Sequence, residues 1–295
     1  MAKPYDHIPD RRMIVRRRAL EAALAVLVED LPSGGEPPRP PVLALLRDAL
    51  AKGRAEIRRR FEEPGPLRND GPAVLAATSY LMDQIVRVLF DFADRYAYPA
   101  ANPSAAERLG VAATGGYGRG ELAPLSDLDL LFLRPYKQTP RGEQIVEFML
   151  YLLWDLGLKV GHATRTVDES LRYAERDQTI RTALLEMRYL WGDRALFDEL
   201  HKGFAQKFYT GDGRDFVEAK LAERDQRHQR MGDSRYVVEP NVKEGKGGLR
   251  DLHLLFWIAK YLYRVSEPGD LVAKGVLTKE EARLLPTRKR LNDAI

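Results

Sequence analysis

The chain has 295 residues, contains no cysteine and carries a formal net charge of +4. This length accommodates two domains and a core that needs neither disulfides nor metal, and the lack of cysteine excludes disulfides and fits a reducing compartment. Basic and acidic residues are mostly interspersed, so the net charge does not indicate binding to a charged polymer. No apolar run approaches the ~18 residues of a membrane span, and we expect a cytoplasmic protein with no membrane partner.

The N-terminal part predicts two helices and a linker. Residues 13–30 and 42–62 are rich in helix-forming residues, whereas residues 31–42 hold five prolines and two glycines. We expect residues 1–65 to form a helical arm rather than a domain. The arginine clusters of this arm lack the interleaved aromatic residues that bind single strands, so we expect solvated helix faces and no nucleic acid partner.

The next segment predicts a helix, a strand, a glycine-rich turn and an acidic strand. Residues 71–98 place apolar side chains at helical spacing, and residues 109–114 form a short apolar strand. The stretch 111–133, VAATGGYGRGELAPLSDLDLLFL, contains the turn and the acidic strand, and residues 119–124 between them can hold one helical turn. The glycines of the turn are Gly115, Gly116, Gly118 and Gly120.

Asp127 and Asp129 are candidate metal ligands in the acidic strand. Successive strand side chains point to opposite faces, so the two carboxylates share a face, roughly 6 to 7 Å apart along the strand. Mg²⁺ prefers a few carboxylates together with substrate phosphates. At Gly115 and Gly116 the missing β-carbon lets the backbone approach a phosphate and donate to it. The stretch therefore predicts a catalytic site for a nucleotide and a divalent metal.

A helix and a further strand follow. Residues 142–156 predict a strongly apolar helix that ends at Gly157, and residues 158–167 alternate as a strand with His162 on one of its faces. The order of strand, glycine turn, acidic strand, helix and strand predicts a small mixed sheet backed by helices.

Beyond Asp168 the pattern is helical, with one interruption. Residues 237–253, VVEPNVKEGKGGLRDLH, contain proline and glycines that helices do not tolerate, and they run into a helix at 249–255. A basic, glycine-rich loop ahead of a helix is either an anion site or an exposed turn. The final residues have no helix stop signal, and we expect the chain to be a piece of a longer protein. Helices are predicted at 168–175, 177–191, 193–209, 212–230, 251–265 and 278–295.

Three stretches in this order resemble a known family. They are GGYGRGELAPLSDLDLL at 115–131, GLKVGHATRT at 157–166 and VEPNVKEGKGGLRDLH at 238–253. Together they resemble the DNA polymerase β-like nucleotidyltransferase superfamily and, more narrowly, the PII uridylyltransferases of bacterial nitrogen control. The resemblance runs from about residue 70 to 265.

The resemblance implies an α+β fold, with a nucleotidyltransferase domain over 66–192 and a helical domain over 193–295 that carries the basic loop 237–250. It implies Mg²⁺-assisted in-line transfer of UMP from UTP to a tyrosine hydroxyl of the PII signal protein, releasing pyrophosphate. Asp127 and Asp129 would be catalytic and would hold the metal. Nucleotide or substrate contacts are expected from Gly115, Gly116, Arg119, Ser126, Lys243, Lys246 and Arg250.

Some of these roles have alternatives. Arg119 would contact a phosphate or else pair with Glu121 or another local acid. The superfamily usually has a third carboxylate on a later strand, but residues 158–167 contain no acid, and His162 is a candidate base or a structural donor there. We expect Lys243, Lys246 and Arg250 to face the two aspartates.

The resemblance does not extend to every activity of the family. The chain has no His-Asp dipeptide, so the HD and ACT domains of the family, with uridylyl removal and glutamine sensing, are not expected here. An adenylyltransferase acting on a protein such as glutamine synthetase and a catalytically silent nucleotide-sensing module remain alternatives. The glycine spacing disfavours dinucleotide binding, because an acidic strand follows where a long helix should begin.

Overall fold

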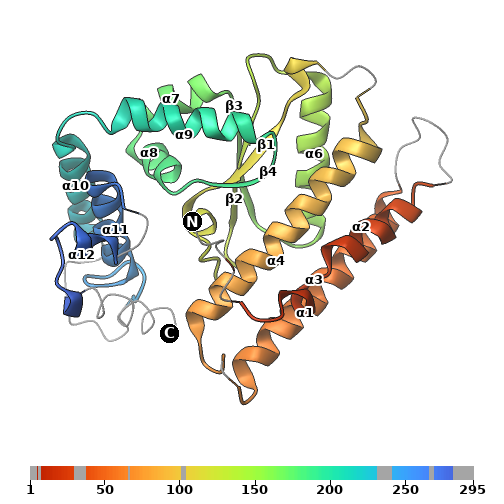
Figure 1. Ribbon diagram of the computed structural model, residues 1–295, viewed down its shortest axis with the longest axis horizontal. Helices are drawn as coiled ribbons and strands as arrows, with labels where there is room; N and C mark the ends of the chain where they lie inside the picture. The colour runs from red at the N-terminus through yellow and green to blue at the C-terminus, as the bar shows by residue number, and fades with distance from the viewer. Residues whose placement is uncertain are drawn as a thin grey trace. The chain divides into compact units, whose positions relative to one another are not determined.

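The computed structural model has an α+β fold, as predicted: helices together with one small mixed sheet of four strands (Figure 1). It divides into two compact units, which we describe separately. Unit 1 comprises residues 1–170 and 186–201, and unit 2 comprises residues 171–185 and 202–295. This division differs from the predicted one, because unit 1 includes the N-terminal arm. The structure describes residues 5, 8–29, 38–65, 67–100, 104–230, 241–265 and 269–281.

The sheet of unit 1 has the strand order β3-β2-β1-β4. Strand β1 (Gly110–Ala113) pairs antiparallel with both β2 (Leu128–Leu133) and β4 (Arg188–Gly192). Strand β3 (Val160–Arg165) pairs parallel with β2, and a parallel pair requires a long crossover connection. Helix α6 (Pro140–Asp155) supplies that crossover.

Helix α6 ends as the sequence predicts. Gly157 has φ +75°, its amide donates to the Trp154 carbonyl over 2.8 Å, and the Leu158 amide donates to the Leu153 carbonyl over 3.1 Å. These are the two hydrogen bonds of a Schellman motif, which glycine favours because it adopts positive φ without a steric cost. This cap turns the chain directly into β3.

The core of unit 1 lies between one face of the sheet and helix α4 (Gly71–Phe92), which a π-helix continues over Ala93–Ala97. Alternate side chains of β2, at Leu128, Leu130 and Phe132, are buried in this core. By length and composition the segment Gly71–Ala97 would suffice to cross a membrane, with a mean hydropathy of 1.4, contrary to the expectation that no run approaches that length. However, 72% of the 18-residue window that meets this test is buried inside the protein.

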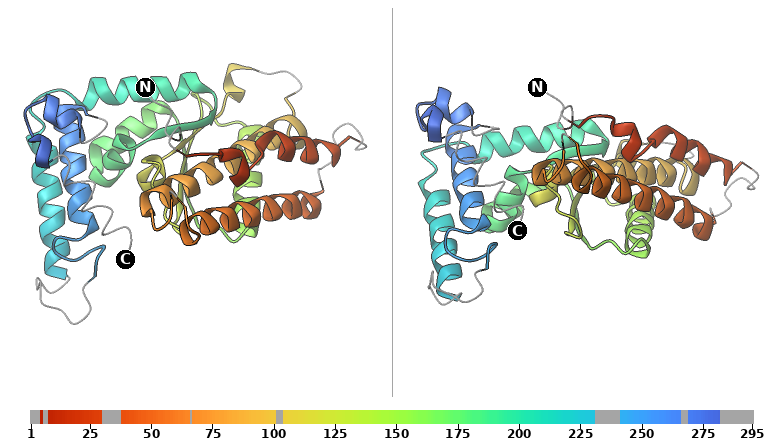
Figure 2. Two further views of the ribbon diagram at one scale, coloured as in Figure 1. Left: turned by 60° about the horizontal axis from the view of Figure 1, so that its bottom comes forward. Right: turned by 90° about the horizontal axis from the view of Figure 1, so that it is seen from below.

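The N-terminal segment packs on α4 instead of standing apart as an arm. The predicted helix 13–30 is interrupted by Val15, whose φ of −156° is extended. Figure 2 shows the N-terminal helices, in red and orange, beside α4, and all of them belong to unit 1. Close packing is evident at Gly53, where an added β-carbon would lie 2.6 Å from a methyl group of Leu81. The helices involved are α1 (Arg11–Ile14), α2 (Arg17–Val26) and α3 (Arg39–Glu62).

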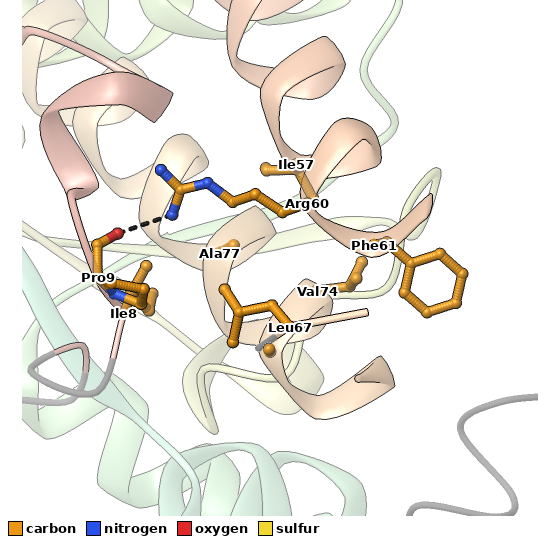
Figure 3. Close-up of a pocket in the computed structure, with 9 residues that line it drawn as sticks. Ile8, Pro9, Ile57, Arg60, Phe61, Leu67, Val74 and Ala77 are labelled. Carbon is orange, nitrogen blue, oxygen red and sulfur yellow. Dashed lines mark hydrogen bonds between the residues drawn. The ribbon is translucent and has the colours of Figure 1, made fainter. Parts of the chain in front are cut away.

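A small pocket lies between α3, α4 and the chain before α1 (Figure 3). Its lining is apolar apart from Arg60, whose guanidinium donates to the Pro9 carbonyl over 2.7 Å and pairs with Glu56. The figure shows Arg60 pointing toward Pro9. The arginine therefore anchors the N-terminal segment to α3.

One predicted helix is wrong in its second half. The predicted helix 177–191 is α8 only over Gln178–Leu185, and the chain then forms β4. Pairing with β1 overrides the local helical pattern, and Trp191, opposite Val111, packs against the core. Strand β4 covers the side of β1 that β2 leaves open.

Unit 2 is helical, and helices α10 and α11 lie side by side in it (Figures 1 and 2). The rings of Phe216 and Tyr261 stack between them with centroids 4.0 Å apart. The predicted helix 278–295 falls mostly outside the described residues. Unit 2 contains α8 together with α10 (Arg214–Arg230), α11 (Leu249–Tyr263) and α12 (Asp270–Ala273), whereas α7 (Val167–Arg176) and α9 (Arg194–Phe208) begin in unit 1 and end in unit 2.

Candidate active site

Asp127 and Asp129 lie together at the start of β2. Asp127, which is exposed, immediately precedes the strand, and Asp129 is half-buried as its second residue. Since Leu128 and Leu130 enter the core, the alternation of the strand puts Asp129 on the opposite face. Burial raises the pKa of the Asp129 carboxyl, and the negative charge of Asp127 raises it further. The structure thus brings the two predicted ligands close enough to repel each other.

Two glycines make room for the Asp129 carboxylate. Gly115 has φ +58°, and a β-carbon there would lie 2.9 Å from Oδ2 of Asp129. Gly161 is the partner of Asp129 in the register of β3, and a β-carbon there would lie 2.6 Å from Oδ1. Any larger residue at either position would displace the carboxylate. The glycine turn and the strand β3 therefore border the acidic site directly.

The two carboxylates fit a divalent cation. Within the described part of the chain, no lysine or arginine pairs with Asp127 or Asp129, and no group of three or more metal-ligating side chains forms. An acidic pair without a basic partner is a donor set for a cation that takes its other ligands from substrate phosphates and water. The usual third carboxylate of the superfamily is not among the described residues of the site.

The glycine turn forms the four-residue helix α5 (Gly115–Gly118). The expected helical turn at 119–124 is therefore wrong in position, because the glycines themselves adopt it. The Thr114 amide donates to the Asp129 carbonyl over 3.0 Å, which ties the start of the turn to β2. The first amides of a helix have no carbonyl partner within it. Gly115 and Gly116 therefore carry donors at the end of the turn that borders Asp129.

Arg119 adopts the second of its two predicted roles. Its Nε donates to Glu121 over 2.9 Å, and its Nη1 donates to both carboxylate oxygens of Glu186, over 2.8 and 2.7 Å. Glu186 is buried, with 4% of its surface exposed. The guanidinium is thus used in a local ion-pair cluster, and this arrangement does not support the predicted phosphate contact.

His162 is not brought to the aspartates. It pairs in register with Leu130, so its side chain lies on the core face of the sheet, opposite to Asp129. Its ring packs edge-on against Trp154 of α6, with centroids 6.1 Å apart. The exposed His162 and Asp129 therefore lie on opposite faces of the sheet, and this arrangement does not support the predicted catalytic role. Ser126, by contrast, is exposed and directly precedes Asp127.

The basic loop lies in unit 2 and begins with an Asn-centred turn. The side-chain oxygen of Asn241 accepts from the amides of Lys243 and Glu244, over 3.0 and 2.8 Å. Lys243 and Lys246 are exposed, and Arg250 donates to Glu244 over 3.1 Å. Helix α11 begins at Leu249, where the sequence predicts it. That the three basic side chains face Asp127 and Asp129 stays a prediction, and residues 237–240 of the loop lie outside the described residues.

Asp251, at the start of α11, closes the loop. One of its carboxylate oxygens accepts from the Gly247 amide over 2.7 Å, and the other accepts from Arg227 over 2.5 Å. Nε2 of His228 lies 3.1 Å from both oxygens. A single carboxylate on α11 thus joins the glycines of the loop to the last turn of α10.

Sequence reasoning missed a buried cluster behind the glycine turn. Asp83 of α4 has no exposed surface, and it pairs with Arg188 of β4, which also donates to the carbonyl oxygens of Tyr117 and Gly118. The available signal was Asp83, an aspartate among the apolar positions of the predicted helix 71–98, since a fully buried acid is rare without a partner. Its partner Arg188 lies in the segment 177–191, which was predicted as a helix, so the pair was not predicted.

The comparisons with known proteins agree with these features. A family model described as GlnD PII-uridylyltransferase matches residues 215–292. A bifunctional uridylyltransferase/uridylyl-removing enzyme of Rhodospirillum rubrum is 58% identical over 271 residues, which is 92% of this chain and 28% of the relative. The chain is thus similar to PII-uridylyltransferases over almost its whole length. Relatives with the same name in Azospirillum brasilense and Erythrobacter litoralis are 56% and 52% identical over 94% and 93% of the chain, and 29% of each relative's length is covered.

These matches confirm the resemblance predicted from the three motifs. The matches extend over more than nine tenths of the chain. The chain spans less than a third of the length of these relatives. The activity of the full-length relatives is therefore assigned to this chain only as a proposal.

Proposed function

We propose that the chain transfers UMP from UTP to a tyrosine hydroxyl of a PII-type signal protein and releases pyrophosphate. The observation that carries the proposal is the unpaired acidic pair Asp127 and Asp129, bordered by Gly115 of the glycine turn. The names of the relatives support uridylyl transfer as the reaction class.

In this reaction the tyrosine oxygen forms a bond to the α-phosphorus of UTP while the bond from that phosphorus to the pyrophosphate oxygen breaks. Asp127 and Asp129 would hold Mg²⁺, which when bound neutralises the negative charge on the phosphates. The amides of Gly115 and Gly116 would donate to the triphosphate, because no β-carbon keeps the phosphate away. Preorganised donors of this kind stabilise the transition state without reorganising during the reaction.

Two further contributions belong to the proposal. Ser126, exposed beside Asp127, would donate its hydroxyl to the nucleotide. Lys243, Lys246 and Arg250 would contact the triphosphate or the protein substrate through their positive charge. We assign no side chain as the base for the tyrosine proton, because His162 lies on the other face of the sheet.

The test is incubation with α-labelled UTP, Mg²⁺ and a PII-type protein, scoring label on tyrosine. Wild-type chain should transfer label, Asp129→Asn should abolish transfer, and Asp198→Asn, which changes an exposed ion pair with Arg194, should leave it intact. Unchanged transfer by Asp129→Asn would remove the site assignment. If the wild-type chain fails, a longer form of the protein in the same assay separates missing parts from a wrong assignment.

The same assay separates the alternatives. An adenylyltransferase would prefer ATP, so a clear preference for ATP over UTP in competition would exclude uridylyl transfer. A nucleotide-sensing module would bind UTP without transferring it, an alternative that the missing third carboxylate keeps open.

A further inference from the structure

The turn that borders the acidic site is held from behind by one arginine. The Arg188 side chain donates from Nε to the Gly118 carbonyl over 3.2 Å and from Nη2 to the Tyr117 carbonyl over 3.0 Å. These carbonyls belong to the last two residues of α5, the end of the turn that faces away from Gly115. A cationic donor at the carbonyl end of a helical turn is favourable because carbonyls there are short of partners within the turn. The Tyr117 carbonyl also accepts from the Gly120 amide over 3.1 Å.

The other donors of Arg188 are fixed by a buried acid. Nη1 and Nη2 donate to the two carboxylate oxygens of Asp83 over 2.7 and 3.1 Å, and the Tyr5 hydroxyl donates to the same carboxylate over 2.9 Å. Arginine alone has a planar fork of five donors that can serve a carboxylate and two carbonyls at once. The guanidinium therefore has one orientation, set by the core helix α4.

The segment just before β4 holds the turn a second time. The Glu186 carbonyl packs so closely on Gly118 that a β-carbon there would lie 2.2 Å from its oxygen. The Glu186 carboxylate pairs with Arg119, the residue that follows the turn. Residues 186–188 thus contact the turn through a backbone oxygen and two side chains.

We propose that Arg188, oriented by Asp83, is a positioning residue that fixes the glycine turn so that the amides of Gly115 and Gly116 are presented beside Asp129. This inference rests on the proposed nucleotidyl transfer, in which those amides bind the triphosphate. Neither Arg188 nor Asp83 touches the reacting groups. Their effect is transmitted through the backbone of α5.

A neighbouring arginine provides a matched control. Arg87 also lies beside Asp83, with Nη2 3.6 Å from Oδ2, and its Nε donates to the Leu190 carbonyl of β4 over 3.0 Å. Arg87 thus contacts Asp83, as Arg188 does, and it also contacts β4, the strand that contains Arg188. Within the described structure, however, Arg87 has no contact with the glycine turn. Comparing the two arginines separates a general loss of packing from a loss of turn geometry.

The experiment measures KM for UTP and kcat for UMP transfer in wild type, Arg188→Lys and Arg87→Lys, together with urea unfolding of each. Lysine keeps the charge beside Asp83 but cannot reach the carboxylate and both carbonyls. We expect Arg188→Lys to raise KM for UTP about tenfold, the loss of one charge-assisted hydrogen bond, while Arg87→Lys stays within about twofold at a similar loss of stability. Hydrogen exchange at residues 115–120 should accelerate only in Arg188→Lys.

If Arg188→Lys does not fold, the double variant Asp83→Asn/Arg188→Met removes both charges together and leaves no unpaired buried charge. The same rise in KM is expected from it. An unchanged KM in the Arg188 variants, or equal changes in the Arg87 variant, would overturn the positioning role while wild-type transfer upholds the proposed function. Absence of transfer both by the wild-type chain and by the longer form of the protein would instead overturn the proposed function itself and this inference with it.

Discussion

Asp129 and Gly161 face each other across the parallel strands β2 and β3, and a β-carbon at Gly161 would lie 2.6 Å from Oδ1 of Asp129. The strand that carries Gly161 therefore shapes the acidic site through the absence of a side chain. We expect Gly161→Ala to displace the carboxylate and to lower UMP transfer by about 100-fold, as small misplacements of catalytic groups do. A transfer assay over a range of Mg²⁺ concentrations checks this.

The control for that prediction is Gly65→Ala, because nothing lies within 4 Å of a β-carbon at Gly65. Both variants add one methyl group to unit 1. Full activity in Gly161→Ala would show that the Asp129 carboxylate has room to move without losing its role.

The raised pKa of Asp129 predicts that replacing this residue by a neutral one increases stability while it lowers activity. Because burial and the charge of Asp127 disfavour its ionised form, the folded state binds a proton more tightly than the unfolded state. Ionised Asp129 therefore opposes folding at neutral pH, and this opposition fades as the pH falls through the raised folded pKa. We expect Asp129→Asn to unfold at higher urea concentration than wild type at pH 7 while transfer falls by at least ~100-fold.

The pH dependence of stability tests whether the charge of Asp129 causes the higher stability expected for Asp129→Asn. The stability difference between Asp129→Asn and wild type should shrink as the pH is lowered, because the wild-type carboxyl then becomes neutral as well. Asp198→Asn, at an exposed ion pair, should show neither effect. A variant less stable than wild type at pH 7 would contradict the argument.

The pKa of the Glu56 carboxyl is shifted in the opposite direction, below its ordinary value. Hydrogen bonds from Arg59 are the largest cause, and with those from Arg60 they lower the pKa of its carboxyl to about 2. A lowered folded pKa contributes stability above the unfolded value of 4.5, and this stability is lost as the pH falls toward the folded value. We expect Glu56→Gln to cost about 1 kcal/mol at pH 7 and much less near pH 3, measured by urea unfolding.

Glu62→Gln is the matched control on the same helix. Its pair with Arg58 is 3.7 Å long and both side chains are mostly exposed, so the variant should change stability by less than about 0.5 kcal/mol. Equal losses in the two variants would mean that the partly buried Arg60 adds nothing to the pair with Glu56.

Local signals in the sequence were sufficient for part of the fold and of the candidate site. The alternation around Asp127 and Asp129 and the glycines at 115 and 157 act over a few residues, and the structure places the strand, the close approach and the helix cap accordingly. The three motifs also led to the family. The single helical turn was misplaced because glycine has low helix propensity, and in the structure Gly118 is enclosed between two carbonyls.

Contacts between residues that are far apart in the sequence could not be predicted from local sequence patterns. Arg119 and Glu186 are separated by 67 residues, and Arg188 and Asp83 by 105. Strand β4 contains both Arg188 and the pairing edge for β1, but its hydrogen bonds form only after β1 is in place, so its sequence alone favoured a helix. The ion pair between Arg119 and the buried Glu186 could not be predicted from the sequence for the same reason.

The last prediction concerns the basic loop of unit 2, which Asp251 closes by accepting from the Gly247 amide and from Arg227. Asp251→Ala removes the acceptor that these groups share, so the loop should lose its fixed shape. We expect hydrogen exchange at residues 243–248 to accelerate about tenfold, the equivalent of one hydrogen bond to a charged group. Asp225→Ala, at an exposed pair with the adjacent Arg224, is the control and should leave exchange unchanged. Unaltered exchange in Asp251→Ala would show that the Asn241 turn alone holds the loop.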